Sequence, residues 1–389
     1  MSRLLLDTAS VLPYFKEHNI PSFRIKQLEQ AIYKESIINI DEITTFSKEL
    51  REQLVRDGFW LNTLVPEKII DGKETTKFLF KLPDGNMIET VLMYHRHQKD
   101  DTEHSQRKIL RSWTDADISP ETHTLNRITV CISSQVGCAV GCIFCVTGKL
   151  GFKKNLDRTE MLMQITYANN FIKSKFGKKE DGTWNKVRNV VFMGMWEPLL
   201  NYDNMKHAIE VMLDQNTLNL SKRHITISTS GVASAIKKLV EDNIEVRLAL
   251  SLHAPNQALR EELIPMIAKR RPLDELMQTI DAYTDALDNR VFYEYIMIKD
   301  KTDTPEIAHQ LWKLLRPRNA HVNLIPYNEN PAMPELITSD YDVILAFKKI
   351  VEWYDVTVTV RDTLGREVKG ACGQLGYEKV QEGETYKKK

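Results

Sequence analysis

Cys138, Cys142 and Cys145 form the pattern C-x3-C-x2-C within eight residues of the chain. Thiolates this close in sequence can bind one metal centre from a single loop. A four-iron cluster ordinarily has four cysteine ligands, so three local cysteines predict a [4Fe–4S] cluster with one iron open to another molecule. Three unrelated buried thiols, or a zinc site with three thiolates, are the alternatives. Only 5 cysteines occur in the chain, which makes chance clustering the weaker explanation, and we favour the cluster.

An open iron suits S-adenosyl-L-methionine (SAM), which can bind it through the amino and carboxylate groups and be cleaved by one electron to a 5′-deoxyadenosyl radical. Such a site must also hold the methionine ammonium, the ribose and the adenine. Glu197, in a short turn, is suited to the ammonium or the ribose. Ser228, Ser251 and Asn323 suit ribose and carboxylate contacts, and His253 can stack or hydrogen-bond. Each residue taken alone is more typical of an ordinary turn or strand end.

The elements that must position these residues alternate regularly along the chain. Short apolar, β-branched runs occur at residues 128–133, 187–193, 224–228, 246–251, 291–298 and 321–326. Amphipathic stretches lie at about 159–173, 203–214, 232–242, 273–287, 304–316 and 340–352. This alternation predicts an α/β fold, a partial (β/α)6 barrel of parallel strands, with a last strand at 356–361.

In such barrels the functional loops follow the C-terminal ends of the strands. The cysteine triplet follows the first strand, Glu197 the second, Ser228 the third and His253 the fourth, while Asn323 lies in the sixth. We therefore expect these side chains at one mouth of the barrel. Their common placement favours a binding role over ordinary turn positions.

The remaining segments predict a small accessory domain and a tail. Residues 1–94 are expected to form an N-terminal domain of helices plus a hairpin, because two segments have helical spacing and two strand-like runs flank a Pro-Asp-Gly turn. Residues 95–125 are expected to be a linker or insertion, and 126–365 the barrel. Residues 366–389 are expected to be a tail, with its last four residues disordered.

Cys131 and Cys372 are left over from the triplet. Small neighbours leave the Cys372 sulfur approachable, which favours a nucleophilic or carrier role over a buried structural thiol. A carrier has a chemical use, because the electrophilic carbon of an aromatic amidine cannot be methylated by polar attack on SAM. A methyl group on a thiol can instead lose hydrogen to the adenosyl radical and add to the ring. The link must then be broken, which requires a base and a second thiol.

Composition is ordinary for a globular protein, with 42% hydrophobic and 27% charged residues among 389. The formal net charge is zero, so no overall field indicates a nucleic-acid partner. No apolar run reaches the roughly 18 residues of a membrane span, and sparse cysteines favour a reducing cytoplasm. Short basic runs, including 173–179, 221–224 and 269–271, gain meaning only if folding brings them to one side.

Several motifs together resemble the RlmN/Cfr family of radical SAM RNA methyltransferases, and its RlmN type in particular. The motifs lie at residues 21–27, 89–91, 133–145, 151–152, 194–201, 228–231, 251–256, 323–327 and 371–375. They cover nearly the whole chain. The continuation after Glu197 resembles the enzymes that methylate adenine C2 more than the Cfr enzymes that methylate C8.

The resemblance implies a role for each cysteine. The triplet would bind the [4Fe–4S] cluster, Cys372 would carry the methyl group as S-methylcysteine, and Cys131 would resolve the RNA–protein link. Glu89 would be the proton acceptor. SAM would contact Trp196, Glu197, Ser228, Ser251, Leu252, His253 and Asn323.

The resemblance also implies substrates and partners. The expected substrates are an adenine of 23S rRNA near the peptidyl-transferase centre and the adenine 3′ of the tRNA anticodon, with the N-terminal domain binding RNA. An electron donor such as flavodoxin with its reductase would supply electrons to the cluster. We expect a cytoplasmic monomer with no membrane contact.

Trp196 departs from the family pattern, which has glycine at this position of the Gly-Met-Gly-Glu-Pro motif. An indole there would crowd the cofactor, because glycine permits a close backbone approach or a positive φ. The loop can reroute and leave the enzyme active, or the protein can bind SAM poorly. Alternatively the codon is UGA, read as glycine in the source organism.

Three alternatives to adenine-C2 methylation therefore stay open. The chain could be a SAM- or RNA-binding homologue without turnover, which Trp196 would explain. It could be a radical SAM enzyme for another substrate, although Cys131 and Cys372 fit the methyl relay. Methylation at C8, as in Cfr, is the third.

Overall fold

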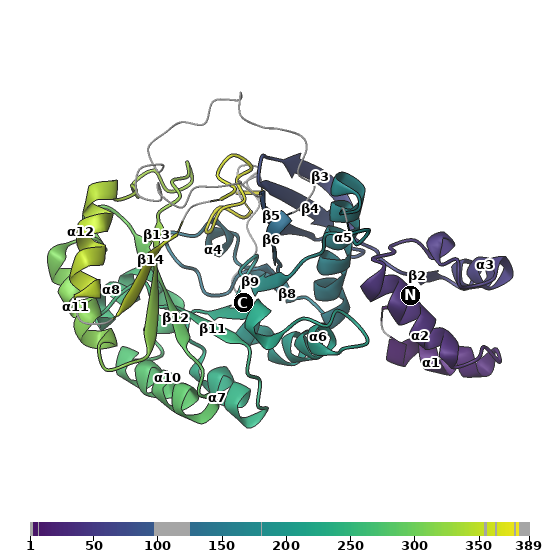
Figure 1. Ribbon diagram of the computed structural model, residues 1–389. Coiled ribbons are helices and arrows are strands. Elements are labelled where there is room, and N and C mark those ends of the chain that lie inside the picture. Colours follow the sequence, from purple (N-terminus) through teal and green to yellow (C-terminus); the bar gives the residue numbers. More distant parts are fainter. Residues whose placement is uncertain are drawn as a thin grey trace.

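The computed structural model describes residues 3–6, 8–96, 125–179, 181–353, 356–361, 364–376 and 379–380. Most of the expected insertion and the expected disordered end of the tail lie outside these residues. Within them, one ten-stranded sheet has the order β14-β13-β12-β11-β10-β9-β6-β5-β4-β3. Figure 1 shows this sheet curved into an open barrel with helices on its outer face.

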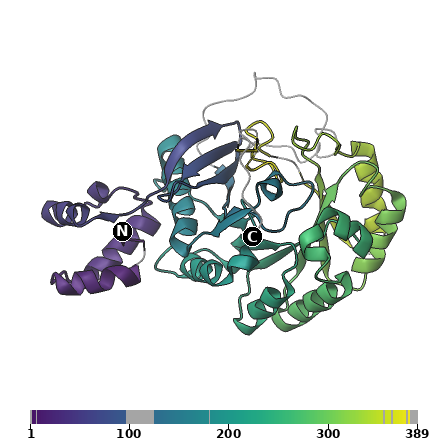
Figure 2. The same cartoon turned by 180° about the vertical axis from the view of Figure 1, so that it is seen from behind.

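The barrel strands are parallel from β6 to β14. They are β6 (Leu125–Cys131), β9 (Asn189–Phe192), β10 (Ile225–Thr229), β11 (Arg247–Ser251), β12 (Val291–Met297), β13 (Ala320–Pro326) and β14 (Thr357–Val360). The main outer helices are α5 (Arg158–Phe176), α6 (Tyr202–Leu213), α7 (Ala233–Glu241), α10 (Leu273–Leu287), α11 (Pro305–Leu315) and α12 (Tyr341–Glu352). The expected alternation of strands and helices is confirmed (Figures 1 and 2).

Local sequence explains why these helices form where they do. At the start of α5 the Asp157 carboxylate accepts a hydrogen bond from the Glu160 amide, and the Glu160 carboxylate accepts one from the Asp157 amide. The two bonds form a complete capping box. Helix α10 buries one stripe that includes Leu273, Leu276 and Ile280, and this spacing turns its apolar face toward the sheet.

The N-terminal helices lie outside the barrel, at the right of Figure 1. They are α1 (Thr8–Glu17), α2 (Phe23–Glu29), the π-helix η1 (Gln30–Lys34), the 3-10 helix η2 (Ile40–Glu42) and α3 (Lys48–Arg56). Beside them, β1 (Arg3–Leu4) pairs with β2 (Phe59–Trp60). Residues 23–33, one of the segments with helical spacing, begin as the α-helix α2 and continue from Gln30 as the π-helix η1. Consecutive residues 31–33 are all buried there, and the wider π-turn accommodates them.

The hairpin is part of the barrel sheet. Its two strands are β4 (Thr75–Lys81) and β5 (Met87–Arg96), and β5 pairs antiparallel with β6. A further strand that was not expected, β3 (Val65–Asp71), pairs antiparallel with β4. Residues 95, 96 and 125 are thus in strands, where a linker was expected. Pairing with β5 satisfies the backbone groups of β6, which would otherwise be a sheet edge.

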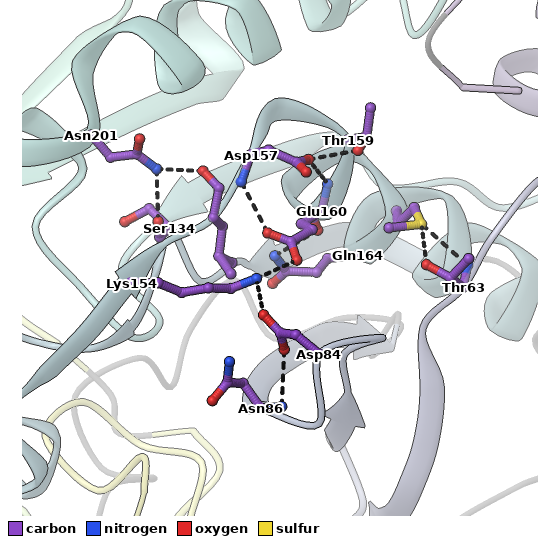
Figure 3. Close-up of polar contacts among 12 residues, drawn as sticks. Thr63, Asp84, Asn86, Ser134, Lys154, Asp157, Thr159, Glu160, Gln164 and Asn201 are labelled. Carbon is purple, nitrogen blue, oxygen red and sulfur yellow. Dashed lines mark hydrogen bonds and ion pairs between the residues drawn. The ribbon is translucent and has the colours of Figure 1, made fainter. Parts of the chain in front are cut away.

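A polar network ties this hairpin to the start of the barrel (Figure 3). Lys154, in the short strand β8 (Phe152–Asn155) that pairs with β7 (Gln135–Gly137), lies 2.5 Å from Asp84 and 2.8 Å from Glu160. The Asn201 amide donates to the backbone oxygens of Ser134 and Leu156 at 2.9 and 2.7 Å. The ends of two loops around the pocket are held by these bonds.

We expect Lys154→Met to loosen the hairpin, because the variant leaves the buried Glu160 carboxylate without its cation. The cost should be about 1 kcal/mol, as for partly exposed ion pairs. Amide hydrogen exchange in β4 and β5 should then accelerate about fivefold. Lys81→Met is the matched control, since Lys81 is exposed at the end of β4. Equal exchange in the two variants would contradict the bridging role.

None of the helices within the described residues is long and apolar enough to cross a membrane.

Candidate active site

A pocket opens at the C-terminal ends of the barrel strands and has an empty volume of about 820 Å³, open mouth included. Its wall combines the cysteine loop, strand ends and the C-terminal segment. The lining residues are Cys138, Cys142, Phe144, Cys145, Thr147, Gly148, Met193, Gly194, Trp196, Ser228, Ser251, His253, Glu294, Ile296, Ile325, Arg361, Cys372, Gly373 and Leu375. Of the residues expected at this mouth, the cysteine triplet, Ser228 and His253 line the pocket, whereas Glu197 and Asn323 do not.

The three clustered cysteines all line this pocket, on the loop between β7 and α4 (Val146–Leu150). Burial raises the pKa of the Cys142 thiol, and the neighbouring Cys145 and Cys138 raise it further. Three thiols brought together in this way need a cationic centre to become thiolates.

The described residues contain no group of three or more His, Cys, Asp or Glu side chains placed to hold a single metal ion. A four-iron cluster binds each cysteine to a different iron, so three cysteines leave the fourth iron open to another molecule. The donor set and the adjoining pocket therefore fit a [4Fe–4S] cluster.

Ser228, Ser251 and His253 line the same pocket as the cysteine loop. The His253 ring accepts a hydrogen bond from the Ile296 amide at 3.2 Å and meets Phe144 edge-on. Burial, aided by Arg260, lowers the pKa of His253 to about 3. The ring is therefore neutral at physiological pH and acts as a fixed wall.

Arg260, in α8 (Gln257–Leu263), was not anticipated from sequence. Its side chain is fully buried and donates to the backbone oxygens of Ser251, Leu252 and Ser230. One guanidinium thus joins the loops after β10 and β11. Leu252 is buried beneath them and does not line the pocket.

Trp196 and Glu197 take opposite positions in the loop after β9. The Trp196 indole lines the pocket, and its nitrogen donates to the Phe192 oxygen at 2.9 Å. Glu197 has φ of +115° and does not line the pocket. Its carboxylate accepts bonds from Thr229, from the amide and hydroxyl of Ser230 and from the Leu199 amide. These protein donors occupy the carboxylate that was expected to contact SAM.

Glu294 and Arg361 form a charged part of the wall that sequence reasoning missed. Asn323 donates to Glu294 at 2.9 Å, and Arg361 lies 3.3 Å from the same carboxylate. Asn323 itself does not line the pocket. A single carboxylate in the otherwise apolar strand β12 was the signal that could have revealed Glu294.

Cys131 and Cys372 approach each other at this wall. Cys372 is an exposed residue that lines the pocket, whereas Cys131 is buried beside Leu375. Burial raises the pKa of the Cys131 thiol, and the nearby Cys372 raises it further. Although Cys372 is exposed as a residue, its thiol is largely shielded from water, which raises its pKa, while Arg361 opposes this shift. Arg361 therefore serves as the shared cation of both thiols.

Arg361→Met should slow alkylation of Cys372 by iodoacetamide by about threefold to tenfold at pH 7.5. The cation favours the thiolate, so its loss raises the pKa of Cys372 further and reduces the thiolate fraction. Peptide mass spectrometry on the cluster-free, reduced protein measures the rate. Arg361→Lys keeps the charge and should retain most of the reactivity. An unchanged rate in Arg361→Met would show that the cation does not act on this thiol.

Glu89 is fully buried in β5, and its carboxylate lies 3.7 Å from the Lys77 ammonium. The register places Val91 opposite Cys131, so Glu89 shares the face of Cys131 two residues further along the strand. Lys77 also donates to the Lys369 oxygen at 3.3 Å. Glu89, the expected proton acceptor, is thus near Cys131, the expected resolving thiol, but does not line the pocket.

Comparisons with known proteins agree with this site. Residues 132–311 match the Radical SAM superfamily. A probable dual-specificity RNA methyltransferase RlmN of Dictyoglomus turgidum is 38% identical over 91% of this chain and 90% of its own length. The dual-specificity RNA methyltransferase RlmN of Aliarcobacter butzleri is 37% identical over 94% of each chain. The crystal structure of a radical SAM methyltransferase from Sphaerobacter thermophilus has a TM-score of 0.80 and 34% identity, covering 94% of this chain and 96% of that one.

The similarity thus extends over almost the full length of these relatives. The expected radical SAM barrel and its cofactors, a [4Fe–4S] cluster and SAM, are confirmed at the level of the family. The chain belongs to the RlmN family of radical SAM RNA methyltransferases.

Proposed function

We propose that this SAM-dependent methyltransferase methylates C2 of adenine in 23S rRNA and in tRNA, with Cys372 carrying the methyl group. The relatives' names include dual-specificity RNA methyltransferases, and one of Nitrosopumilus maritimus is a ribosomal RNA large subunit methyltransferase. The observation that carries the proposal is the placement of Cys372. It lines the same pocket as the three cluster cysteines and lies close to a second thiol, Cys131.

The methyl group is first placed on Cys372. The thiolate attacks the methyl carbon of SAM, so that a sulfur–carbon bond forms as the sulfonium–carbon bond breaks and S-adenosylhomocysteine leaves. Arg361 assists because its positive charge favours the thiolate. Cys372 lines the pocket, so SAM bound there can reach its sulfur.

The cluster, when bound, supplies the electron that cleaves a second SAM to the radical that removes a hydrogen atom from the S-methyl group. Cys138, Cys142 and Cys145 are the proposed cluster ligands. Ser228, Ser251 and His253 are proposed to hold SAM because they line the pocket that also contains that loop. Trp196 contacts the same space. Glu197, Leu252 and Asn323 would act through their neighbours, since they do not line it.

The S-methylene radical then adds to C2 of the adenine, and the ring radical so formed must give up one electron, for which the cluster, when bound, would be the acceptor. The closed-shell adduct is then released by Glu89 and Cys131. Glu89 removes the ring proton, and Lys77 stabilises the carboxylate beforehand. The Cys131 thiolate attacks the Cys372 sulfur, so that a disulfide forms and the bond from sulfur to the methylene carbon breaks. The electron pair of that bond goes to the methylene carbon, which takes a proton. An external dithiol reductant must then restore both thiols.

The RNA must present an unstacked adenine, because the pocket is enclosed by loops and admits a base only outside a helix. The N-terminal helices, which project from the barrel beside the hairpin (Figure 1), are proposed to contact RNA. A flavodoxin-type electron donor, a monomeric state and a cytoplasmic location belong to the same proposal.

The test is anaerobic reconstitution with iron and sulfide, followed by incubation with SAM, a reductant and unmodified 23S rRNA or tRNA. Mass spectrometry of the digested RNA should detect 2-methyladenosine. Methylation at C8 alone would favour the Cfr-like alternative. Absence of methyladenosine from both RNAs, with an intact cluster, would overturn the proposal.

A second candidate is a SAM- or RNA-binding homologue with impaired turnover. The observation in its favour is the Trp196 indole on the pocket wall, together with the Glu197 carboxylate, which is hydrogen-bonded to Ser230 and does not line the pocket. This candidate predicts RNA binding with normal affinity and SAM cleavage slower than about one event per enzyme per hour.

A further inference from the structure

The barrel interior below the pocket is polar and partly open to solvent. Side chains alternate along a strand, so residues two or four positions before the pocket-lining Ser228, Ser251 and Glu294 also face the interior. Those positions include His224, Thr226, Arg247 and Phe292, and all four are only partly buried.

The opposite faces of the same strands differ sharply. Ile225, Ile227, Leu248 and Val291 are all buried against the outer helices. Barrel interiors are ordinarily filled by bulky apolar side chains. An interior that instead carries arginine, histidine and threonine is not explained by packing.

Four arginines gather at the N-terminal end of four adjacent strands. Arg127 is in β6, and the Arg188 amide, just before β9, donates to the Ile128 oxygen at 3.0 Å. Arg223 lies in η6 (Lys222–His224), directly before β10, whose Thr226 is paired with Arg247 of β11. The pairing of Ile225 with Val190 aligns the ends of β9 and β10.

No carboxylate within the described residues forms an ion pair with any of these four arginines. Burial lowers the pKa of Arg247, and Arg127 and Arg223 lower it further. Burial likewise lowers the pKa of His224. The four arginines lower it further, in the order Arg223, Arg188, Arg247 and Arg127. The like charges are therefore close enough to repel one another, and a bound anion would relieve that repulsion.

Aromatic rings orient the innermost arginine. The Arg247 guanidinium lies 5.6 Å from the centre of the Phe292 ring, and that ring is 5.1 Å from His321. A guanidinium that packs against a ring keeps its N–H groups available at its edge, where they match two oxygens of a phosphate. The geometry is that of an anion site with a rigid floor.

We propose that the N-terminal end of the barrel binds a phosphate group, with Arg247 at the floor and Arg127, Arg188 and Arg223 at the rim. The phosphate belongs either to a small free anion, such as a diphosphate, or to the backbone of bound RNA. This site is separate from the methylation pocket, which lies at the opposite ends of the same strands. It does not depend on which RNA position is methylated.

The test uses the full-length reconstituted protein and inorganic pyrophosphate as the probe, followed by isothermal titration calorimetry. We expect saturable binding at one site that weakens at least about tenfold in Arg247→Gln and in Arg223→Gln. The matched control is Arg316→Gln, because Arg316 also packs against a ring, that of Trp312 at 5.5 Å, but lies outside the arginine group. The control should bind as the wild type does.

A parallel arm measures fluorescence anisotropy of a labelled single-stranded RNA with the same variants. If Arg223→Gln weakens RNA binding and pyrophosphate competes with the RNA, the RNA backbone is the natural source of the phosphate. If only pyrophosphate binding falls, a small free anion is the source. Arg127 and Arg223 are exposed, so Arg127→Gln and Arg223→Gln should fold normally. They test the site even if Arg247→Gln misfolds.

Two results would overturn the proposal. One is that neither pyrophosphate nor RNA binding changes in any of the rim variants, which would mean that neither ligand binds at this end of the barrel. The other is an equal loss of binding in Arg316→Gln, which would indicate a nonspecific charge effect.

Discussion

Trp196→Gly should raise the affinity of the reconstituted protein for SAM by about tenfold or more and raise methyl transfer with it. The indole lies on the wall shared by Gly194, Met193 and the cysteine loop. Removing it enlarges the pocket next to the place where the open iron is proposed to be. Glycine also accepts backbone conformations that tryptophan resists.

The same change should release Glu197. Its carboxylate now accepts bonds from Thr229 and Ser230 in a conformation with φ of +115°, which is strained for a residue with a Cβ. A more flexible residue 196 allows the loop to turn Glu197 toward the pocket. Equilibrium dialysis with labelled SAM measures the affinity, and single-turnover formation of 5′-deoxyadenosine measures the chemistry.

Trp353→Gly is the matched control, since Trp353 is 74% exposed at the end of α12. It should leave SAM binding unchanged. Unaltered affinity in Trp196→Gly would mean that the indole does not obstruct the cofactor. Mass spectrometry of the peptide from the source organism separately decides whether residue 196 is tryptophan or glycine in the native protein.

Cys131→Ala should trap a covalent protein–RNA adduct and reduce release of methylated RNA more than about a thousandfold. Without the second thiol, nothing attacks the Cys372 sulfur to break its bond to the methylene carbon. Cys131 is placed for that attack because it is buried next to Leu375 of the segment that carries Cys372. Denaturing electrophoresis should show a shifted band that ribonuclease removes.

Cys372→Ala provides the contrast for this prediction. It lacks the methyl carrier, so it should form neither adduct nor product while keeping its cluster absorbance. Free methylated RNA at normal yield from Cys131→Ala would rule out a resolving role. An adduct in Cys372→Ala would show that another residue carries the methyl group.

The alternation of apolar runs was sufficient to predict the barrel, because strands and helices that are buried on one or both faces have apolar residues at regular spacing in the sequence. The strand at 291–298 and the helix at 273–287 lie where expected. The hairpin was also predicted, but not its pairing with β6, since strand partners far apart in sequence leave no local signal.

By itself, the sequence determined the donor chemistry: three clustered cysteines, two further thiols and a turn in which Trp196 stands in place of glycine. Only the tertiary structure decided which of these groups share a pocket. It placed Cys372 near Cys131 and Arg361, turned Glu197 toward Thr229 and gathered four arginines at the other end of the barrel. The physical reason is that charge partners and pocket walls come from contacts between distant strands, whose register the local pattern of residues does not encode.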